Sequence, residues 1–230
     1  MDIKQIGRRE AIGRLGAAGA AFTFGCGGES VTIPSTTTTT TIPGTSAACA
    51  VTPSETIGPF PSLTDLIRTD IREGKSGTTL TLTITVVNTN NGCSPVSGAN
   101  VEIWQCDAAG NYSQYGSQTA QTYLRGIQTT NANGEVTFTT IYPGWYQGRA
   151  THIHVEVVRN GASGKVTQIA FPESSNAAVY ATGVYASRGS NPTSNSSDGI
   201  FADSIASELA TVTGDPTSGY TATFKVGIAV

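Results

Sequence analysis

Charged residues are scarce in this 230-residue chain. They make up 13% of it, with 13 Lys plus Arg against 16 Asp plus Glu and a formal net charge of -3. Proteins that bind nucleic acid carry a concentrated basic surface, which this balance does not supply. No nucleic-acid partner is therefore expected, and a chain low in charge and rich in Gly, Thr and Ser is typical of secreted β-rich proteins.

Long apolar runs are also missing. Residues 1–26 place Arg8 and Arg9 ahead of the short run "LGAAGAAFTFG", far below the roughly 20 apolar residues of a membrane-spanning helix. The order of these regions resembles a twin-arginine export signal, the alternative being a chance arginine pair before a short helix. We therefore expect an exported protein, whether periplasmic, at the cell surface or extracellular. Cys26 closes the run and is a candidate for lipid attachment and membrane anchoring, although Thr23 and Phe24 depart from the usual lipoprotein pattern.

Large apolar residues remain few from residue 27 to residue 48, a stretch of Thr, Ser and Pro that predicts a flexible, disordered tether. Residues 49–230 are then long enough to form one domain with a core. Export permits disulfides, and Cys93 and Cys106, which flank a turn and a strand, are the candidate pair. Cys49 has no assigned partner at this stage.

The sequence of residues 49–230 shows no pattern of a long amphipathic helix. The stretch "TTLTLTITVVN" alternates Thr with apolar residues, and "NVEIWQC", "GEVTFTTI", "THIHVEVV", "KVTQIAF" and "YTATFKVGIAV" follow between Gly, Asn and Pro turns. This pattern predicts an all-β fold, a sandwich of mostly antiparallel strands. Short helices are expected at residues 62–71 and 201–210.

Histidine is scarce: the chain has two, His152 and His154, and a single residue separates them. In a strand, residues i and i+2 point to the same side, so the pair presents two nitrogen ligands together. Tyr146 lies six residues before His152, Tyr112 follows the predicted strand "NVEIWQC", and no carboxylate stands within the motif "GRATHIH". Phenolate oxygen is a hard anionic ligand, so two histidines with two tyrosines indicate Fe(III) rather than Fe(II) or zinc. The alternative is a secreted β-sandwich binding module in which the histidines are only structural.

Several motifs in a fixed order carry a resemblance to a known family. They are "TPSETIGPF", "LTITVVN", "PVSGANVEIWQCDAAGNY", "YLRGIQTTNANGEVTFTTIYPGWY", "GRATHIH", "KVTQIAF" and "GYTATFKVGIAV". Together they cover nearly all of residues 49–230, and the chain resembles the intradiol ring-cleavage dioxygenases, the non-haem Fe(III) family of the protocatechuate and catechol dioxygenases.

The resemblance implies a set of site residues. The iron ligands it implies are Tyr112, Tyr146, His152 and His154. Arg149 matches an arginine beside the bound substrate, and Gln168 matches a glutamine of the same pocket. Gly58 and Pro59 fall in a stretch that approaches the pocket in the protocatechuate enzymes, or they form an ordinary turn.

The resemblance also implies a reaction. A small aromatic diol would bind Fe(III) as a dianion and displace Tyr146, which accepts a substrate proton. O2 would then cleave the ring between the two hydroxyl-bearing carbons, giving a muconate-type dicarboxylic acid that holds both oxygen atoms. Arg149 and Gln168 would act on the substrate. The choice among catechols is left open.

Two departures from the family limit what carries over. The segment between Tyr146 and Arg149 is shorter than in the protocatechuate enzymes, and the N-terminal helical dimerisation region of the catechol dioxygenases is absent. No oligomeric state is therefore inherited. Tyr115 is expected to be an ordinary half-buried tyrosine. Arg125 is expected to hold a loop in place by donating hydrogen bonds to the carbonyl groups of that loop.

Overall fold

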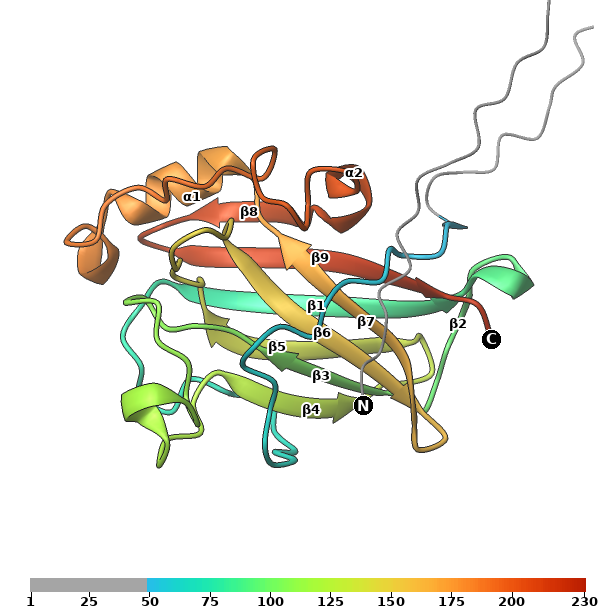
Figure 1. Ribbon diagram of the computed structural model, residues 1–230. Coiled ribbons are helices and arrows are strands. Elements are labelled where there is room, and N and C mark those ends of the chain that lie inside the picture. The colour runs from blue at the N-terminus through green and yellow to red at the C-terminus, as the bar shows by residue number, and fades with distance from the viewer. Residues whose placement is uncertain (1–48) are drawn as a thin grey trace, which may run out of the picture. The chain divides into compact units, whose positions relative to one another are not determined.

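Strand β1 (Thr79–Asn88) carries the alternation expected from the sequence, with its leucines, Ile84 and Val86 fully buried and its threonines facing outward. It belongs to a computed structural model that describes residues 49–230 (Figure 1). The predicted export signal (1–26), with Cys26, and the predicted tether (27–48) lie outside the described residues.

Strand β1 lies inside a five-stranded sheet. It pairs antiparallel with β2 (Ser94–Pro95) and β5 (Glu135–Ile141) and parallel with β9 (Gly219–Ile228), which in turn pairs antiparallel with β8 (Thr211–Asp215). The parallel pairing brings the end of the chain beside its first strand.

The second sheet has four strands, all antiparallel. Its order is β4 (Arg125–Thr129), β3 (Asn100–Trp104), β6 (His152–Arg159) and β7 (Ala162–Ala170). The predicted all-β fold of mostly antiparallel strands is confirmed.

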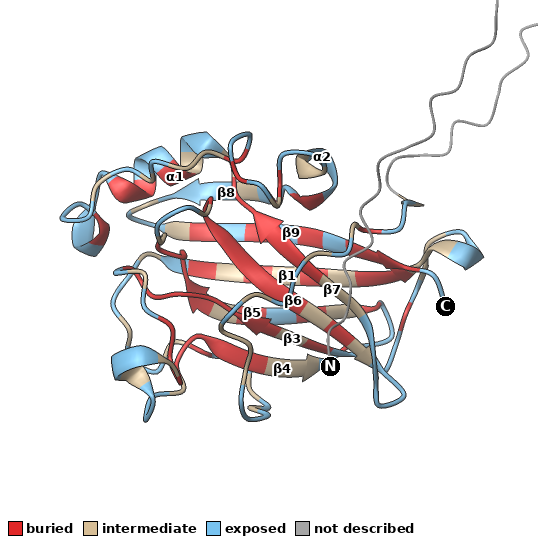
Figure 2. Cartoon of the chain, viewed as in Figure 1, coloured by how far each residue is buried: buried red, intermediate tan, exposed pale blue. Residues whose placement is uncertain are grey.

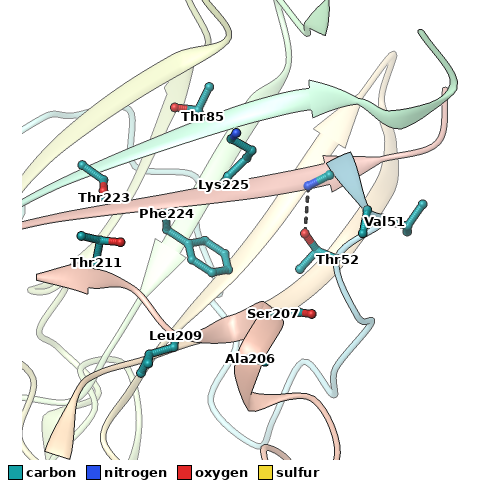
Figure 3. A pocket seen from close by; sticks show the side chains of 12 residues that line it. Val51, Thr52, Thr85, Ala206, Ser207, Leu209, Thr211, Thr223, Phe224 and Lys225 are labelled. Atoms are coloured by element: carbon teal, nitrogen blue, oxygen red, sulfur yellow. Dashed lines mark hydrogen bonds between the residues drawn. The ribbon is translucent and has the colours of Figure 1, made fainter. Parts of the chain in front are cut away.

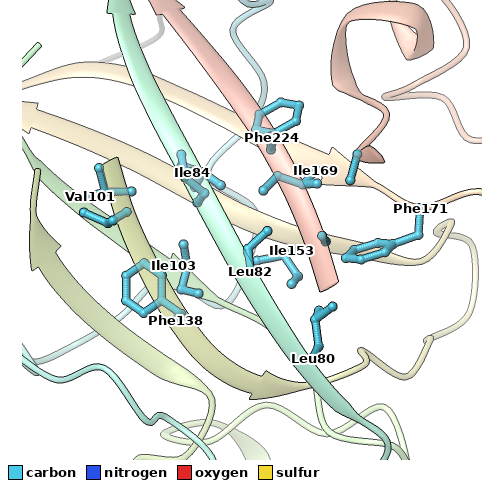
Figure 4. Close-up of a cluster of buried hydrophobic side chains, with 14 of the residues drawn as sticks. Leu80, Leu82, Ile84, Val101, Ile103, Phe138, Ile153, Ile169, Phe171 and Phe224 are labelled. Atoms are coloured by element: carbon cyan, nitrogen blue, oxygen red, sulfur yellow. The ribbon is translucent and has the colours of Figure 1, made fainter. Parts of the chain in front are cut away.

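The core lies between the two sheets. Ile103, Ile153 and Ile169 of the four-stranded sheet join Leu82 and Phe138 of the other in one cluster of buried side chains (Figure 4). Strand β6 is also buried on its other face at His152 and His154, so its first four residues are buried whichever way they point (Figure 2). A strand buried on both faces needs a second layer of chain over its outer face.

Helices are few and short in the described part of the chain. They are α1 (Glu173–Tyr180), α2 (Ile205–Glu208) and three 3-10 turns at Thr89–Asn91, Gly116–Gln118 and Gly183–Tyr185. Helix α2 confirms part of the helix expected at residues 201–210. Within residues 49–230 no helix has the length and apolar character needed to cross a bilayer.

The helix expected at residues 62–71 is wrong. This segment is extended, with Ile67 bridging Ile127 of β4 and Asp70 bridging Thr139 of β5. Strands β4 and β5 lie at sheet edges, where unpaired backbone groups need partners. The segment supplies them through bonds such as Thr139 N–H to the Thr69 carbonyl at 2.9 Å, so backbone pairing at both edges overrides local helix propensity.

The predicted disulfide between Cys93 and Cys106 is also wrong. Cys93 is bonded to Cys49, and Cys106 is a buried free thiol whose pKa burial raises to about 12. Strand β3 (Asn100–Trp104) runs between Cys93 and Cys106, and an extended strand rises about 3.3 Å per residue. It therefore carries Cys106 away from Cys93 and into the layer over the four-stranded sheet.

We expect the Cys49–Cys93 bond to stabilise the domain substantially. Replacing both cysteines by serine should lower the free energy of unfolding by about 2–4 kcal/mol, because the unfolded chain loses a cross-link between residues 44 apart. Urea denaturation of the double variant tests this, with the reduced wild-type protein as the matched control. An unchanged unfolding midpoint in the double variant would contradict the assignment.

Candidate metal centre

The candidate ligands gather on the outer face of the four-stranded sheet. His152 and His154 point outward from β6, whereas Ile153 and Val155 point into the core. The register places Arg125, Trp104, His154 and Gln168 opposite one another, one on each strand. This cross-strand row forms the floor of the site.

The two histidines present their Nε2 atoms to each other. His152 donates from Nδ1 to the carbonyl oxygen of Ala150 at 2.7 Å, a bond that leaves the lone pair on Nε2. The two Nε2 atoms are 3.2 Å apart. Because metal–nitrogen bonds of about 2.1 Å that meet near a right angle leave their nitrogens about 3 Å apart, one ion can take both.

Two tyrosines complete the group. The Tyr146 hydroxyl lies 3.2 Å from His152 Nε2, and the Tyr112 ring lies 5.8 Å from the Tyr146 ring and 6.3 Å from the His154 ring, between centroids. The Tyr112 hydroxyl is buried beside that of Tyr146, and no hydrogen bond of ordinary geometry reaches it. A buried unpaired hydroxyl is costly, and a bound cation would satisfy it.

Burial sets the charge of all four groups. It lowers the pKa of His152 to about 3 and, with the charges of His152 and Arg149, that of His154 well below its usual range. Burial also raises the pKa of Tyr112 well above 10 and, against the opposing charge of Arg149, that of Tyr146. The histidines are thus neutral ligands, and the phenols need a nearby cation to become phenolates.

The ligand set therefore fits Fe(III). Among residues 49–230 no three His, Cys, Asp or Glu side chains gather as a metal site, so a metal held by these histidines needs oxygen ligands of another kind. Tyr112 and Tyr146 supply them, and phenolate oxygen suits a hard, highly charged ion.

Arg149 lies beside the ligands in a hydrogen-bonded chain. Its Nε donates to Asp198 Oδ2 at 2.9 Å and its Nη2 to Gln168 Oε1 at 2.6 Å, while Gln168 Nε2 donates to the Thr56 carbonyl at 2.9 Å. Its charge acts on the pKa of Tyr112, Tyr146 and both histidines. The structure thus brings Arg149 and Gln168 to the predicted ligands.

A strap of residues 55–60 covers the floor. Gly58 has φ of +77°, and a Cβ atom there would lie 2.7 Å from His154 Cε1, so the close approach requires glycine. Phe60 stacks on Tyr112 with ring centroids 4.7 Å apart. The predicted Gly58 lies against a candidate ligand, whereas Pro59 beside it is exposed.

Two floor residues hold these layers together. Trp104 stacks on His154 with centroids 5.0 Å apart and planes 2° from parallel. Arg125 is fully buried and donates to the carbonyls of Phe60 at 3.0 Å and Ser113 at 2.7 Å. The loop-holding role expected for Arg125 is confirmed, since it ties the strap to the loop that carries Tyr112.

Sequence reasoning missed Asp198, which is fully buried in the loop after α1. Besides binding Arg149, it accepts the Ala150 N–H at 2.6 Å and the Ile200 N–H at 2.8 Å. Burial works to raise its pKa, but these N–H groups and Arg149 outweigh burial and hold the pKa below the ordinary value. No motif surrounds Asp198 in the sequence. It stands in a stretch rich in Ser and Asn, and an aspartate in such a stretch does not by itself indicate a site.

A carboxyl group next to the site should make stability depend on pH. Glu208 ends α2, is fully buried and accepts a hydrogen bond from Thr167 at 3.3 Å; burial raises its pKa from 4.5 to about 7. The folded protein holds this proton more tightly than the unfolded chain does. Stability is therefore lost as pH rises from about 4.5 to about 7, by roughly 3 kcal/mol.

Glu208→Gln is expected to remove this loss. The variant should unfold at a higher temperature than the wild type above pH 7 and show little difference near pH 4.5. Thermal unfolding across that range measures the effect, with Asp65→Asn, at an exposed carboxylate that does not act on Glu208, as the control. An equal difference between variant and wild type at every pH would contradict the assignment.

A separate hollow of about 490 Å³ lies beside β9 and α2. It is lined by Val51, Thr52, Leu209, Phe224 and Lys225 among others, and Thr52 closes one side by accepting the Gly227 N–H at 2.8 Å (Figure 3). None of the candidate ligands lines it, so the hollow is distinct from the metal centre.

The chain is similar in sequence and in fold to known dioxygenases. Residues 60–190 match a family model described as Dioxygenase. The catechol 1,2-dioxygenase of Candida albicans is 34% identical over 109 residues, which cover 38% of this chain and 36% of that relative. The match thus spans about a third of that enzyme's length.

Solved structures extend the comparison over most of the chain. The intradiol ring-cleavage dioxygenase from Tetranychus urticae is 32% identical, with a TM-score of 0.70 over 79% of this chain and 95% of that chain. The dioxygenase domain of a dioxygenase and carbohydrate-binding protein fusion from Streptomyces sp. SirexAA-E is 28% identical, with a TM-score of 0.59 over 79% and 99%.

Proposed function

The chain belongs to the intradiol ring-cleavage dioxygenase family, and on that premise we propose that it uses Fe(III) and O2 to cleave catechol-type diols. The ring would open between the two hydroxyl-bearing carbons and yield a muconate-type dicarboxylic acid. The observation that carries the proposal is the convergence of two histidine Nε2 atoms and two phenols, one buried and one half-buried, on one point of the sheet.

Tyr112, Tyr146, His152 and His154 are the proposed ligands. The buried, unpartnered hydroxyl of Tyr112 supports a permanent place in this set. Tyr146 is less buried, and its hydroxyl already has a partner in His152. It is therefore the ligand we expect to leave when a diol binds.

A bound Fe(III) would supply the electron withdrawal that makes the ring of a chelated diol reactive toward O2. The protein would supply the proton acceptor, because the Tyr146 oxygen, beside His152, could take a proton from a substrate hydroxyl. Arg149, which lies beside the ligands and is held in place by Asp198 and Gln168, would act as a fixed hydrogen-bond donor to the substrate oxygen on which negative charge develops.

The strap and the floor would exclude water from this chemistry. Phe60 on one side and Trp104 on the other cover Tyr112 and His154 with aromatic surface. A site with fewer waters strengthens the action of Arg149 on the substrate, because charges interact more strongly where the dielectric is low.

Labelled oxygen tests the proposal. The Fe(III)-loaded protein is given catechol under isotopically labelled O2, and the product is analysed by mass spectrometry. We expect both labelled atoms in one molecule of an open-chain dicarboxylic acid. Tyr112→Phe should lose the activity, while Tyr115→Phe, on the same loop, should keep it; label entering from water instead of O2 would contradict the proposal.

We also propose export, as the N-terminal sequence suggests. The Cys49–Cys93 disulfide supports it, because such bonds persist in oxidising compartments and are rare in the cytosol. Fractionation of cells that express the full chain, with Arg8 and Arg9 replaced by lysine as the comparison, tests this; retention of the wild-type protein in the cytosol would contradict it.

A further inference from the structure

We propose that this site selects diols whose ring carries no carboxylate, and that Asp198 enforces the selection by taking up the charge of Arg149. The inference rests on the proposed ring-cleaving function and names the substrate class within it. Its basis is the hydrogen-bonded state of the cations near the candidate ligands.

Two cations act on the pKa of the candidate ligands, Arg149 and Arg125. A carboxylate on the substrate ring would need one of them as its counter-ion, because an unpaired charge is costly to bury. Whether either guanidinium is free therefore decides which substrates fit.

Arg149 is already paired. Its Nε contacts both oxygens of Asp198, at 2.9 and 3.2 Å, and its side chain is only 15% exposed while that of Asp198 is fully buried. The two backbone N–H groups that Asp198 also accepts hold its carboxylate in place. A ring carboxylate would have to compete with a fixed internal carboxylate for the same guanidinium.

Arg125 is committed to the backbone. Its Nε donates to Ser113 Oγ at 2.9 Å, in addition to the bonds that it makes to the carbonyls of Ser113 and Phe60. Because it is fully buried beneath the strap, it cannot turn toward a ligand without breaking the tie between strap and loop.

Two other residues near Arg149 and the candidate ligands are a carboxylate, Glu55, and an aromatic residue, Phe60. Glu55 on the strap lies within electrostatic reach of Arg149 and Asp198, so a further carboxylate would meet like charge. Phe60 contacts Tyr146 edge-on, with ring centroids 6.2 Å apart, and offers apolar surface. An alkyl or aryl substituent can pack against such surface, which a carboxylate cannot do without losing its water.

The wild-type test compares two diols of similar size, 4-methylcatechol and 3,4-dihydroxybenzoate, which differ in having a methyl or a carboxylate on the ring. We expect kcat/KM to favour the methyl compound by about 100-fold or more, because the ring carboxylate would meet like charge without a free counter-ion. Dissociation constants measured under argon should show the same order. Equal use of both diols would overturn the inference alone, whereas turnover of neither would contradict the proposed function as well.

Asp198→Asn tests the assigned residue. The amide keeps an acceptor for the backbone but frees the charge of Arg149, so the preference for the methyl compound should shrink at least tenfold. If Asp198 had only a structural role, the variant would have a lower kcat/KM for both diols and an unchanged ratio between them. That result would overturn the assignment. Asp198→Glu, which restores the charge, should return the ratio towards wild type, and Asp203→Asn, a nearby exposed carboxylate, should not move it.

Discussion

A His154→Gln variant is expected to lose its iron and, with it, ring cleavage. His154 is fully buried, its Nε2 lies 3.2 Å from that of His152, and the chain has no third histidine to replace it. Residues that only orient metal ligands change affinity or activity by roughly 10–100-fold, so the loss of a direct ligand should exceed about 100-fold. Iron content per chain and O2 uptake with catechol measure the effect.

Glutamine is chosen because it approaches histidine in volume and keeps a polar group under the strap. Glu156→Gln is the matched control. Glu156 is the next outward-facing residue of β6 after His154 and is not one of the proposed ligands. Thermal unfolding separates lost iron from lost fold. A folded His154→Gln protein that keeps one iron per chain and normal turnover would contradict the ligand assignment.

Arg149→Lys is expected to keep iron and lose kcat by about 10²–10³-fold, the usual cost of removing an electrostatic contact made to developing charge. Lysine keeps one positive charge for the buried Asp198 but lacks the planar fork that reaches Asp198 and Gln168 together. Stopped-flow measurement with catechol should show that diol binding changes little while turnover falls.

Arg149→Gln extends the test. It leaves the fully buried Asp198 without its counter-ion and is therefore also expected to destabilise the fold by about 3–5 kcal/mol. Arg159→Gln, at the exposed end of β6, is the control for both variants. An Arg149→Lys enzyme with wild-type kcat would show that the arginine only supports the loop.

Much of the site could be predicted because its residues lie in regular strands or short motifs. The period of two placed His152 and His154 on one face, because alternation in the sequence reports local strand geometry directly. The resemblance to the family, and not the strand pattern, supplied the other predicted site residues, which are Tyr112, Tyr146, Arg149 and Gln168. The structure adds the register that sets Gln168 opposite His154.

The errors came from contacts between distant segments. Asp198 reaches Arg149 across 49 residues, and no local pattern predicts such a pair. Cys49 meets Cys93 because residues near Cys49 follow the end of β9, with Thr52 N–H bonded to the Gly227 carbonyl at 3.0 Å. The sequence favoured Cys106 instead, because it shows that Cys93 and Cys106 flank a turn and a strand but does not show which distant segment lies beside Cys93.

The wrongly predicted helix at residues 62–71 also came from contacts between distant segments, which hold these residues extended. Ile67 and Asp70 take positions that depend on the exposed edges of β4 and β5, and a sequence read by itself does not say which strands will lie at an edge.

The colour of the Fe(III)-loaded protein tests the central claim most directly. Tyrosinate bound to Fe(III) absorbs visible light by charge transfer, so the proposed centre should make the protein burgundy, with a band that shifts when catechol is added under argon. Tyr112→Phe and Tyr146→Phe should each weaken or move the band, because each removes one phenolate. A protein that stays colourless after loading with iron would contradict the proposed metal centre.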